Sequence, residues 1–146
     1  MKSMRRRPSA RLLITDPTGR VLLFRFVHQR GALAGQSYWA TPGGAVEEGE
    51  TFAQAAVREL QEETGIQLAS AGESVARHEF ELQLPDGEWV IADERYFRIA
   101  AQHGEISRAG WTPLELEIMS EHRWWSVDEI RAATETIYPP DLADMI

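Results

Sequence analysis

The sequence contains no cysteine, so it excludes a disulfide framework, a thiolate metal site and a cysteine nucleophile. It also lacks a long apolar run. The run that follows the basic start, Leu12 to Ile14, is far too short for the core of a signal peptide, and no stretch approaches the length that spans a membrane. These absences predict a protein of the cytoplasm, a reducing compartment, without a membrane anchor.

Basic residues are fewer than acidic ones, 15 compared with 23, and the formal net charge is −8 at pH 7. Electrostatic binding to nucleic acid needs a basic face that releases counterions, so we do not expect nucleic acid as a partner. The exception is the cluster Arg5–Arg7. A phosphate contact is one interpretation of this cluster, but we favour a flexible basic tail at residues 1–7.

A length of 146 residues with 43% hydrophobic content fits one domain, residues 1–146, with a single core. Apolar runs at Ala10 to Thr15 and Val21 to Val27, separated by an Asp-Pro-Thr-Gly turn, predict a hairpin. A second antiparallel pair is expected from His78 to Leu84 and from Trp89 to Ala101. The sequence does not determine the oligomeric state, and a homodimer is compatible with it.

The negative charge is concentrated in the segment Gly44 to Ile66. This segment holds six glutamates and one arginine, and therefore five of the eight surplus negative charges of the chain. Such a concentration indicates that something positive binds here.

A helix from about Thr51 to Thr64 is predicted within this segment. Thr51 and Gln54 form a capping box, and Gly65 provides a left-handed stop. Glu59, Glu62 and Glu63 fall on one stripe of this helix beside its apolar face. Acidic side chains in the last turn oppose the helix dipole, and a local preference broken in this way is typical of a functional site.

The segment resembles the Nudix box of the Nudix hydrolases. The resemblance covers 23 of 146 residues and fills nine signature positions at fixed spacing: Gly44, Glu50, Arg58, Glu59, Leu60, Glu62, Glu63, Gly65 and Ile66. It implies the Nudix fold, an α/β/α sandwich around a mixed β-sheet, which agrees with the α/β (α+β) class indicated by the strands and helices.

Clustered carboxylates are hard oxygen ligands that suit Mg²⁺, or Mn²⁺, rather than zinc, and magnesium is usually completed by substrate phosphates. By resemblance, the metal ligands are Glu59, Glu62 and Glu63, joined by Glu50 and by the backbone carbonyl of Gly44. The implied reaction is the hydrolysis of a phosphoanhydride bond in a nucleoside diphosphate linked to another group. Arg58 is expected to orient a neighbouring carboxylate through a bidentate contact.

The general base stays open between a glutamate of the box and an acid outside it. The outside candidates are Glu115, Glu117 and Glu121, and Glu121 is favoured because it is nearest the predicted strand Arg123 to Trp125. The loops Gly31 to Ser37 and Gln102 to Ser120 are expected to set the specificity.

Three other functions agree less well with the sequence than hydrolysis does. A diphosphate isomerase of similar fold depends on a cysteine, and this chain has none. A calcium site would place its acids in a loop, whereas here they lie on a predicted helix. A non-catalytic nucleotide-sensing domain remains the alternative, although such domains tend to have degraded boxes.

Overall fold

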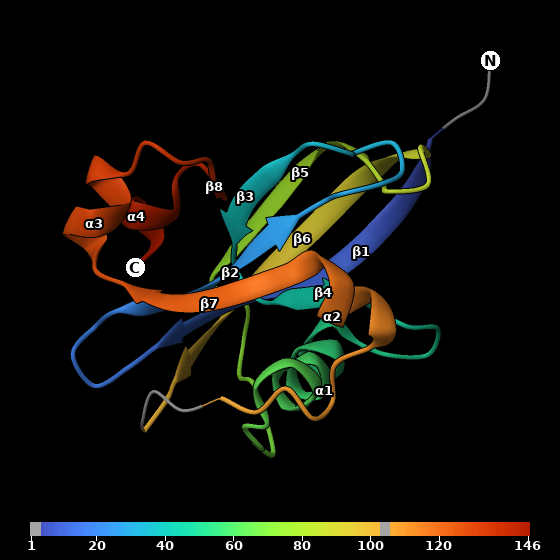
Figure 1. Cartoon of the computed structure of the whole chain (residues 1–146). Helices are drawn as coiled ribbons and strands as arrows, with labels where there is room; N and C mark the ends of the chain where they lie inside the picture. The colour runs from blue at the N-terminus through green and yellow to red at the C-terminus, as the bar shows by residue number, and fades with distance from the viewer. Residues whose placement is uncertain (1–3, 103–105) are drawn as a thin grey trace.

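The computed structural model describes residues 4–102 and 106–146, and it forms one curled, mixed sheet with helices on both faces (Figure 1). Expectations for residues 1–3 and 103–105 lie outside the described part of the chain. In chain order the elements are β1 (Arg5–Thr15), β2 (Val21–Val27), β3 (Ser37–Ala40), β4 (Gly43–Ala45), α1 (Phe52–Thr64), β5 (Ala76–Gln83), β6 (Trp89–Ala100), α2 (Pro113–Ile118), β7 (Met119–Trp125), α3 (Val127–Ala132), β8 (Ile137–Tyr138) and α4 (Leu142–Met145).

The strands follow the order β5-β6-β1-β2-β3-β8, with β4 paired to β1 and β7 paired to β2. Both predicted antiparallel pairs, β1 with β2 and β5 with β6, are confirmed. The parallel pair of β1 with β6 makes the sheet mixed. The short strand β4 matters most for the site, because it joins the sheet directly to the acidic segment that follows it.

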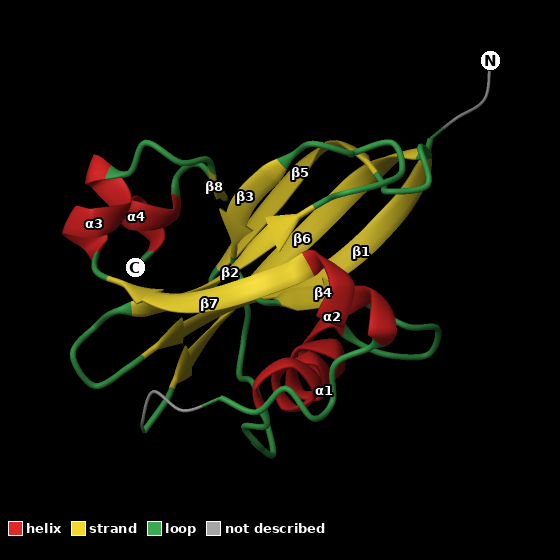
Figure 2. Cartoon of the chain, viewed as in Figure 1, coloured by secondary structure: helices red, strands yellow, loops and turns green. Residues whose placement is uncertain are grey.

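Two hydrophobic cores lie on opposite faces of this sheet (Figure 2). On one face α1 buries Ala55, Ala56 and Leu60 against even-numbered residues of β1 and β2, such as Leu12 and Phe24. On the other face α3 and α4 cover odd-numbered residues of the same strands. The predicted α+β sandwich is therefore confirmed. In the described ranges, no helix is both long enough and apolar enough to cross a membrane.

The interpretation of residues 5–7 as part of a flexible tail is wrong. Arg5 begins β1, and the parallel pairing with β6 runs from Arg5 opposite Val90 onward. The guanidinium of Arg5 binds both carboxylate oxygens of Glu88, and that of Arg6 binds Glu79. These residues are ordered by partners more than 70 positions away in the sequence, which no local pattern reveals.

Helix α1 has the ends predicted from the sequence. The capping box of Thr51 with Gln54 is present in both directions, and Gly65 ends the helix with φ 81° while its N–H donates to Gln61. The chain enters this helix from the corner Gly43-Gly44 in β4, where Gly43 has φ 138°. A Cβ on Gly43 would lie 2.1 Å from the carbonyl oxygen of Ala10 in β1. The corner is therefore close-packed on backbone and requires glycine.

We predict that Gly43→Ala destabilises the protein far more than Gly72→Ala does. Gly72 also has a positive φ of 74°, but a Cβ there would meet nothing within 4 Å. Its substitution should cost about 1–2 kcal/mol of backbone strain, or a few °C in Tm for a domain of this size. At Gly43 the overlap with β1 is added to that strain. Thermal unfolding of both variants tests this, and equal losses of Tm would contradict the close packing of the corner.

Candidate functional site

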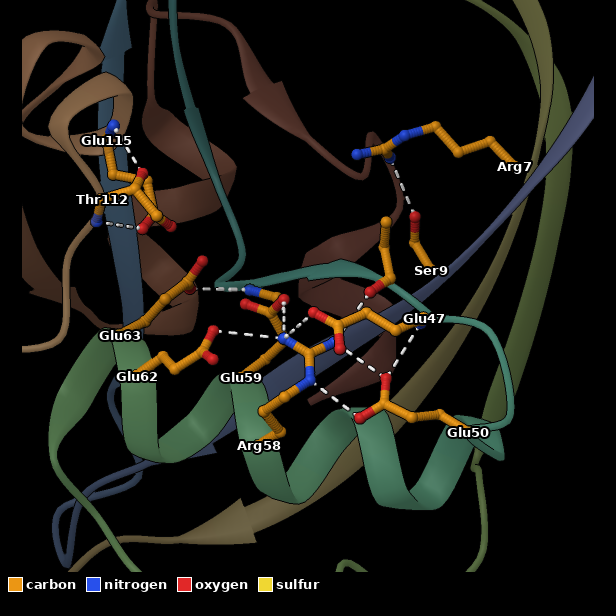
Figure 3. Close-up of polar contacts among 12 residues, drawn as sticks. Arg7, Ser9, Glu47, Glu50, Arg58, Glu59, Glu62, Glu63, Thr112 and Glu115 are labelled. Atoms are coloured by element: carbon orange, nitrogen blue, oxygen red, sulfur yellow. Dashed lines mark hydrogen bonds and ion pairs between the residues drawn. The ribbon is translucent and has the colours of Figure 1, made fainter.

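The carboxylates of Glu59 and Glu63 on α1 contact the corner Gly43-Gly44. Thr112 and Glu115, at the start of α2, lie on the same side of α1 as Glu63 (Figure 3). Carboxylate oxygens of Glu59, Glu63 and Glu115 all lie within 4.8 Å of one another. Glu59 and Glu63 are only 8% and 3% exposed. Two turns of α1 and one turn of α2 thus build a compact, largely buried group of three like charges.

The glycine corner shapes this group. The N–H of Gly43 donates to a carboxylate oxygen of Glu63 at 2.9 Å. The carboxylate of Glu59 packs on Gly44, where an added Cβ would lie 2.5 Å from its Oε1 atom. Gly44 is therefore glycine because Glu59 occupies the space that a side chain would take.

Arg58 organises the remaining acids of the segment. Its Nε and Nη2 groups donate to the two carboxylate oxygens of Glu50 at 2.8 and 2.9 Å. Nη1 donates to Glu59 at 2.9 Å and to Glu62 at 3.1 Å, and Nη2 also donates to the carbonyl of Ala45 at 2.9 Å. A guanidinium has five N–H groups, so these five bonds use all of them. The bidentate contact expected for Arg58 is present, and its partner is Glu50.

The glutamates of the site differ in how well a neighbouring positive charge balances them. The bonds between Arg58 and Glu50 raise the pKa of Arg58 and lower the pKa of Glu50. Burial, in contrast, raises the pKa of Glu59 despite its bond to Arg58. Burial and the neighbouring charge of Glu59 raise the pKa of Glu63 well above its ordinary value. The positive charge near Glu59 and Glu63 thus does not offset their burial, as expected of carboxylates placed to hold a cation.

The loop before α2 completes the end of α1. The N–H of Ser107 donates to the carbonyl of Thr64, and the buried indole of Trp111 donates to the carbonyl of Glu63, both at 2.8 Å. A Cβ on Gly110 would lie 2.6 Å from the carbonyl oxygen of Glu62. Because the last turn of α1 has no basic side chain, this loop supplies the donors that the final carbonyls need. The next residue, Thr112, caps α2 and carries the chain to Glu115.

Glu62 and Glu50 lie at the rim of the group. The side chain of Glu62 is 44% exposed, compared with 10% for Glu59. A hollow lies beside it at the C-terminal end of α1, lined by Arg58, Gln61, Glu62, Gly65, Gln67, Ser107, Ala109 and Gly110. The structure thus places Glu59 and Glu63 of the box in the compact group, whereas Glu50 and Glu62 are joined to it through Arg58 and lie outside that group, with Glu62 on the open side.

Glu121, the favoured acid outside the box, lies elsewhere. It pairs in register with Arg25 on β2 and forms an ion pair with it at 3.6 Å. Arg25 follows Val21 and Leu23 on the face covered by α3 and α4, so Glu121 points away from α1. Glu115, a candidate that ranked below it, is the outside acid that reaches the cluster. Glu117 instead pairs with Arg30.

We predict that Glu63→Gln stabilises the protein at neutral pH when EDTA removes divalent ions. With a raised pKa, Glu63 makes the folded wild type hold a proton that the unfolded chain releases, so stability falls as pH rises above about 4.5. One pKa unit is worth about 1.4 kcal/mol. The Tm advantage of the variant should therefore vanish near pH 4 and grow as the pH rises above about 4.5.

Glu73→Gln, a change at an exposed position, is the control and should shift Tm by the same small amount at every pH. An advantage of Glu63→Gln that does not depend on pH would show that the carboxylate of Glu63 is not strained by burial.

A model of the NUDIX domain matches residues 5–144 of the chain. The RNA pyrophosphohydrolase of Sphingopyxis alaskensis is 32% identical over 132 residues, which cover 85% of this chain and 80% of that protein. The oxidized purine nucleoside triphosphate hydrolase of Danio rerio is 35% identical over 119 residues, covering 82% and 65%. The match to the RNA pyrophosphohydrolase of Teredinibacter turnerae is 42% identical over 60 residues, covering 41% of this chain, and spans only 32% of that relative.

Solved structures agree with the fold. The MutT protein from Methanosarcina mazei Go1 is 25% identical with a TM-score of 0.68, covering 99% of this chain and 93% of that one. The E. coli ORF135 protein is 27% identical with a TM-score of 0.65, covering 99% and 89%. Since the family model matches almost the whole chain, the protein belongs to the Nudix family.

Proposed function

We propose that this hydrolase cleaves a phosphoanhydride bond in a nucleoside diphosphate linked to another group, with Mg²⁺ or Mn²⁺ as the cofactor. The observation that carries the proposal is the buried group Glu59, Glu63 and Glu115, whose oxygens lie within 4.8 Å of one another. Its charge is met only in part by Arg58, which bonds to Glu59 and to neither of the other two. A divalent cation supplies the missing charge.

The donor set fits such an ion. It offers carboxylate oxygens and no sulfur or imidazole, which is the chemistry that magnesium and manganese prefer. When bound, the ion neutralises phosphoryl oxygens and lowers the pKa of a coordinated water. Glu59 and Glu63 would hold it from α1, with Gly44 beside them and with Glu62 on the exposed side towards the substrate.

The protein fixes these ligands before the substrate arrives. The N–H of Gly43 holds one oxygen of Glu63, and Nη1 of Arg58 holds one oxygen of Glu59. In each carboxylate the second oxygen is left for the ion. A guanidinium is suited to holding these carboxylates in position, because its planar group of N–H donors reaches Glu50, Glu59 and Glu62 at once. A lysine ammonium cannot do this.

Glu115 is the residue that we assign as proton acceptor for the attacking water. The N–H of Thr112 binds its Oε1 atom within the capping box of α2, so the side chain is oriented while the other oxygen remains available. It is half-buried, more open than Glu59 or Glu63. An acid within reach of the cation and of solvent is suited to remove a proton from a bound water.

The names of the relatives support a nucleotide substrate, since one acts on RNA and another on oxidized purine nucleoside triphosphates. The decisive experiment is a panel of nucleoside triphosphates, dinucleoside polyphosphates, ADP-ribose and nucleotide sugars, with and without Mg²⁺. Release of phosphate, pyrophosphate or nucleoside monophosphate only with the metal is expected. Binding without turnover of any compound would favour the nucleotide-sensing alternative.

Glu63→Gln and Glu62→Gln should each lower kcat by orders of magnitude at saturating Mg²⁺, because each removes a charge that faces the cation. Glu115→Gln should also lower kcat strongly, about 100-fold, which is typical for the loss of a general base. Glutamine keeps the acceptor oxygen of the capping box, so α2 should remain folded.

Glu117→Gln, two residues further along α2, is the matched control, and Glu121→Gln tests the other outside acid. Both should retain activity within about threefold of wild type. A large loss in Glu121→Gln together with an active Glu115→Gln would contradict the assignment of the proton acceptor.

A further inference from the structure

Strand β5 is an edge of the sheet, and the side of its backbone away from β6 is unpaired. It comes first in the order β5-β6-β1-β2-β3-β8, and among the described strands only β6 pairs with it. Its 8 residues all pair with β6 without a register shift, and none of them is buried. An edge of this length offers a row of N–H and C=O groups to a further strand.

Three features that protect sheet edges, namely short length, proline and a bulge, are absent from β5. The last strand of the order, β8, has only 2 residues. The pairing of β7 with β2 is broken by a register shift between Arg25 and Phe26. On β5, by contrast, the regular strand carries Phe80, which is 42% exposed. Such an edge is typical of a surface that binds another strand.

The hydrogen-bond pattern of the β5–β6 hairpin determines which residues of β5 direct their backbone outward. The N–H of Leu84 donates to the carbonyl of Glu88 at 2.8 Å, so Leu84 bonds towards β6. Because inward and outward backbone groups alternate along an antiparallel strand, Arg77, Glu79 and Glu81 direct theirs to the free edge. An antiparallel partner strand must place outward residues of its own opposite these three.

Charge selects the partner strand and its register. The carboxylate of Glu81 is exposed and has no polar partner within the described part of the chain. Arg77 donates from Nε to Asp93 at 3.0 Å and from Nη2 to Asp93 and Glu79, which leaves its Nη1 group outside these bonds. When two copies of β5 pair around Glu79, Arg77 of each copy lies opposite Glu81 of the other.

This register also agrees with the remaining side chains. The two copies of Glu79 face each other, but each is held by Arg6 of its own chain at 2.6 Å and by Arg77. On the other face, Phe80 lies opposite His78 of the second copy and diagonal to its Phe80, within reach of an aromatic contact. Registers centred on Arg77 or Glu81 would instead place like charges opposite each other without such compensation.

We propose that the free edge of β5 is a homodimer interface, in which two copies pair antiparallel around Glu79 and continue the sheet from one subunit into the other. The partner is a second copy because the row Arg77, Glu79 and Glu81 complements itself at both ends when it is reversed. The charged side chains that would repel an unrelated strand thus attract this one. The interface does not depend on the proposed function.

Sedimentation velocity over a range of protein concentrations tests the interface. The wild type should pass from monomer to dimer as the concentration rises. Glu81→Arg should raise the dissociation constant about 10- to 100-fold, because two exposed ion pairs become two repulsions. Asp128→Arg, the same change of charge at an exposed position of α3, is the matched control and should leave the dissociation constant unchanged.

A mixture of two variants tests the register. Arg77→Glu and Glu81→Arg should each dimerise weakly alone but associate when mixed, because the introduced glutamate then faces the introduced arginine. Thermal unfolding shows whether Arg77→Glu is folded, since it also loses the bonds to Asp93. If it is unfolded, Glu81→Pro takes its place: it removes an outward N–H, leaves the ladder with β6 intact and should be monomeric.

Three results would overturn the proposal. The first is a wild type that stays monomeric at every concentration. The second is a dimer that neither Glu81→Arg nor Glu81→Pro weakens, which would place the contact on another surface. The third is a mixture of folded variants that does not associate.

Discussion

The structure depends on the packing of two buried carboxylates, those of Glu59 and Glu63, against the backbone of Gly43 and Gly44. Isolated buried charges are unfavourable by several kcal/mol each unless they are paired. Within residues 4–102 and 106–146, one oxygen of each carboxylate accepts a hydrogen bond, from Gly43 or from Arg58. The two glycines are required because any Cβ would displace either β1 or Glu59. Sheet, corner and helix are thus arranged around two carboxylates whose charge, in the proposed function, a divalent cation would balance.

The end of α1 shows how the fold supports this arrangement. Helix C-termini expose carbonyls that are normally met by basic side chains or a cap, but basic side chains here would neutralise the acids that the site needs. The indole of Trp111 and the backbone of Ser107 satisfy two of these carbonyls as neutral donors. The same loop then delivers Glu115 to the cluster. The stability of the helix end and the position of the outside acid therefore have one structural cause.

The sequence predicted what short-range chemistry determines. Thr51 and Gln54 fix the start of α1 and Gly65 fixes its end, because caps act within a few residues. Two expectations are wrong because pairing with strands that are distant in the sequence determines where these side chains lie. Arg5 and Arg6 are ordered by β6 and β5, and Glu121 is turned away by its register with Arg25 on β2. Nearness to a strand in sequence did not reveal which face of that strand a side chain occupies. Only the contact of the loop before α2 with the end of α1 distinguishes Glu115 from the acids beside it.

The overall charge raises the question of how an acidic protein accepts a polyanion. A formal charge of −8 repels free polyphosphate at long range. A phosphate chain already complexed with a divalent ion carries less negative charge, and that ion matches the vacant oxygens of Glu59 and Glu63. The attraction between the complex and the protein then acts at short range, between the ion and these carboxylates. Arg58 is fully used in holding Glu50, Glu59, Glu62 and the carbonyl of Ala45. Because the attraction comes from the ion and not from a free guanidinium, an excess of glutamate around the site is compatible with the binding of an anionic substrate.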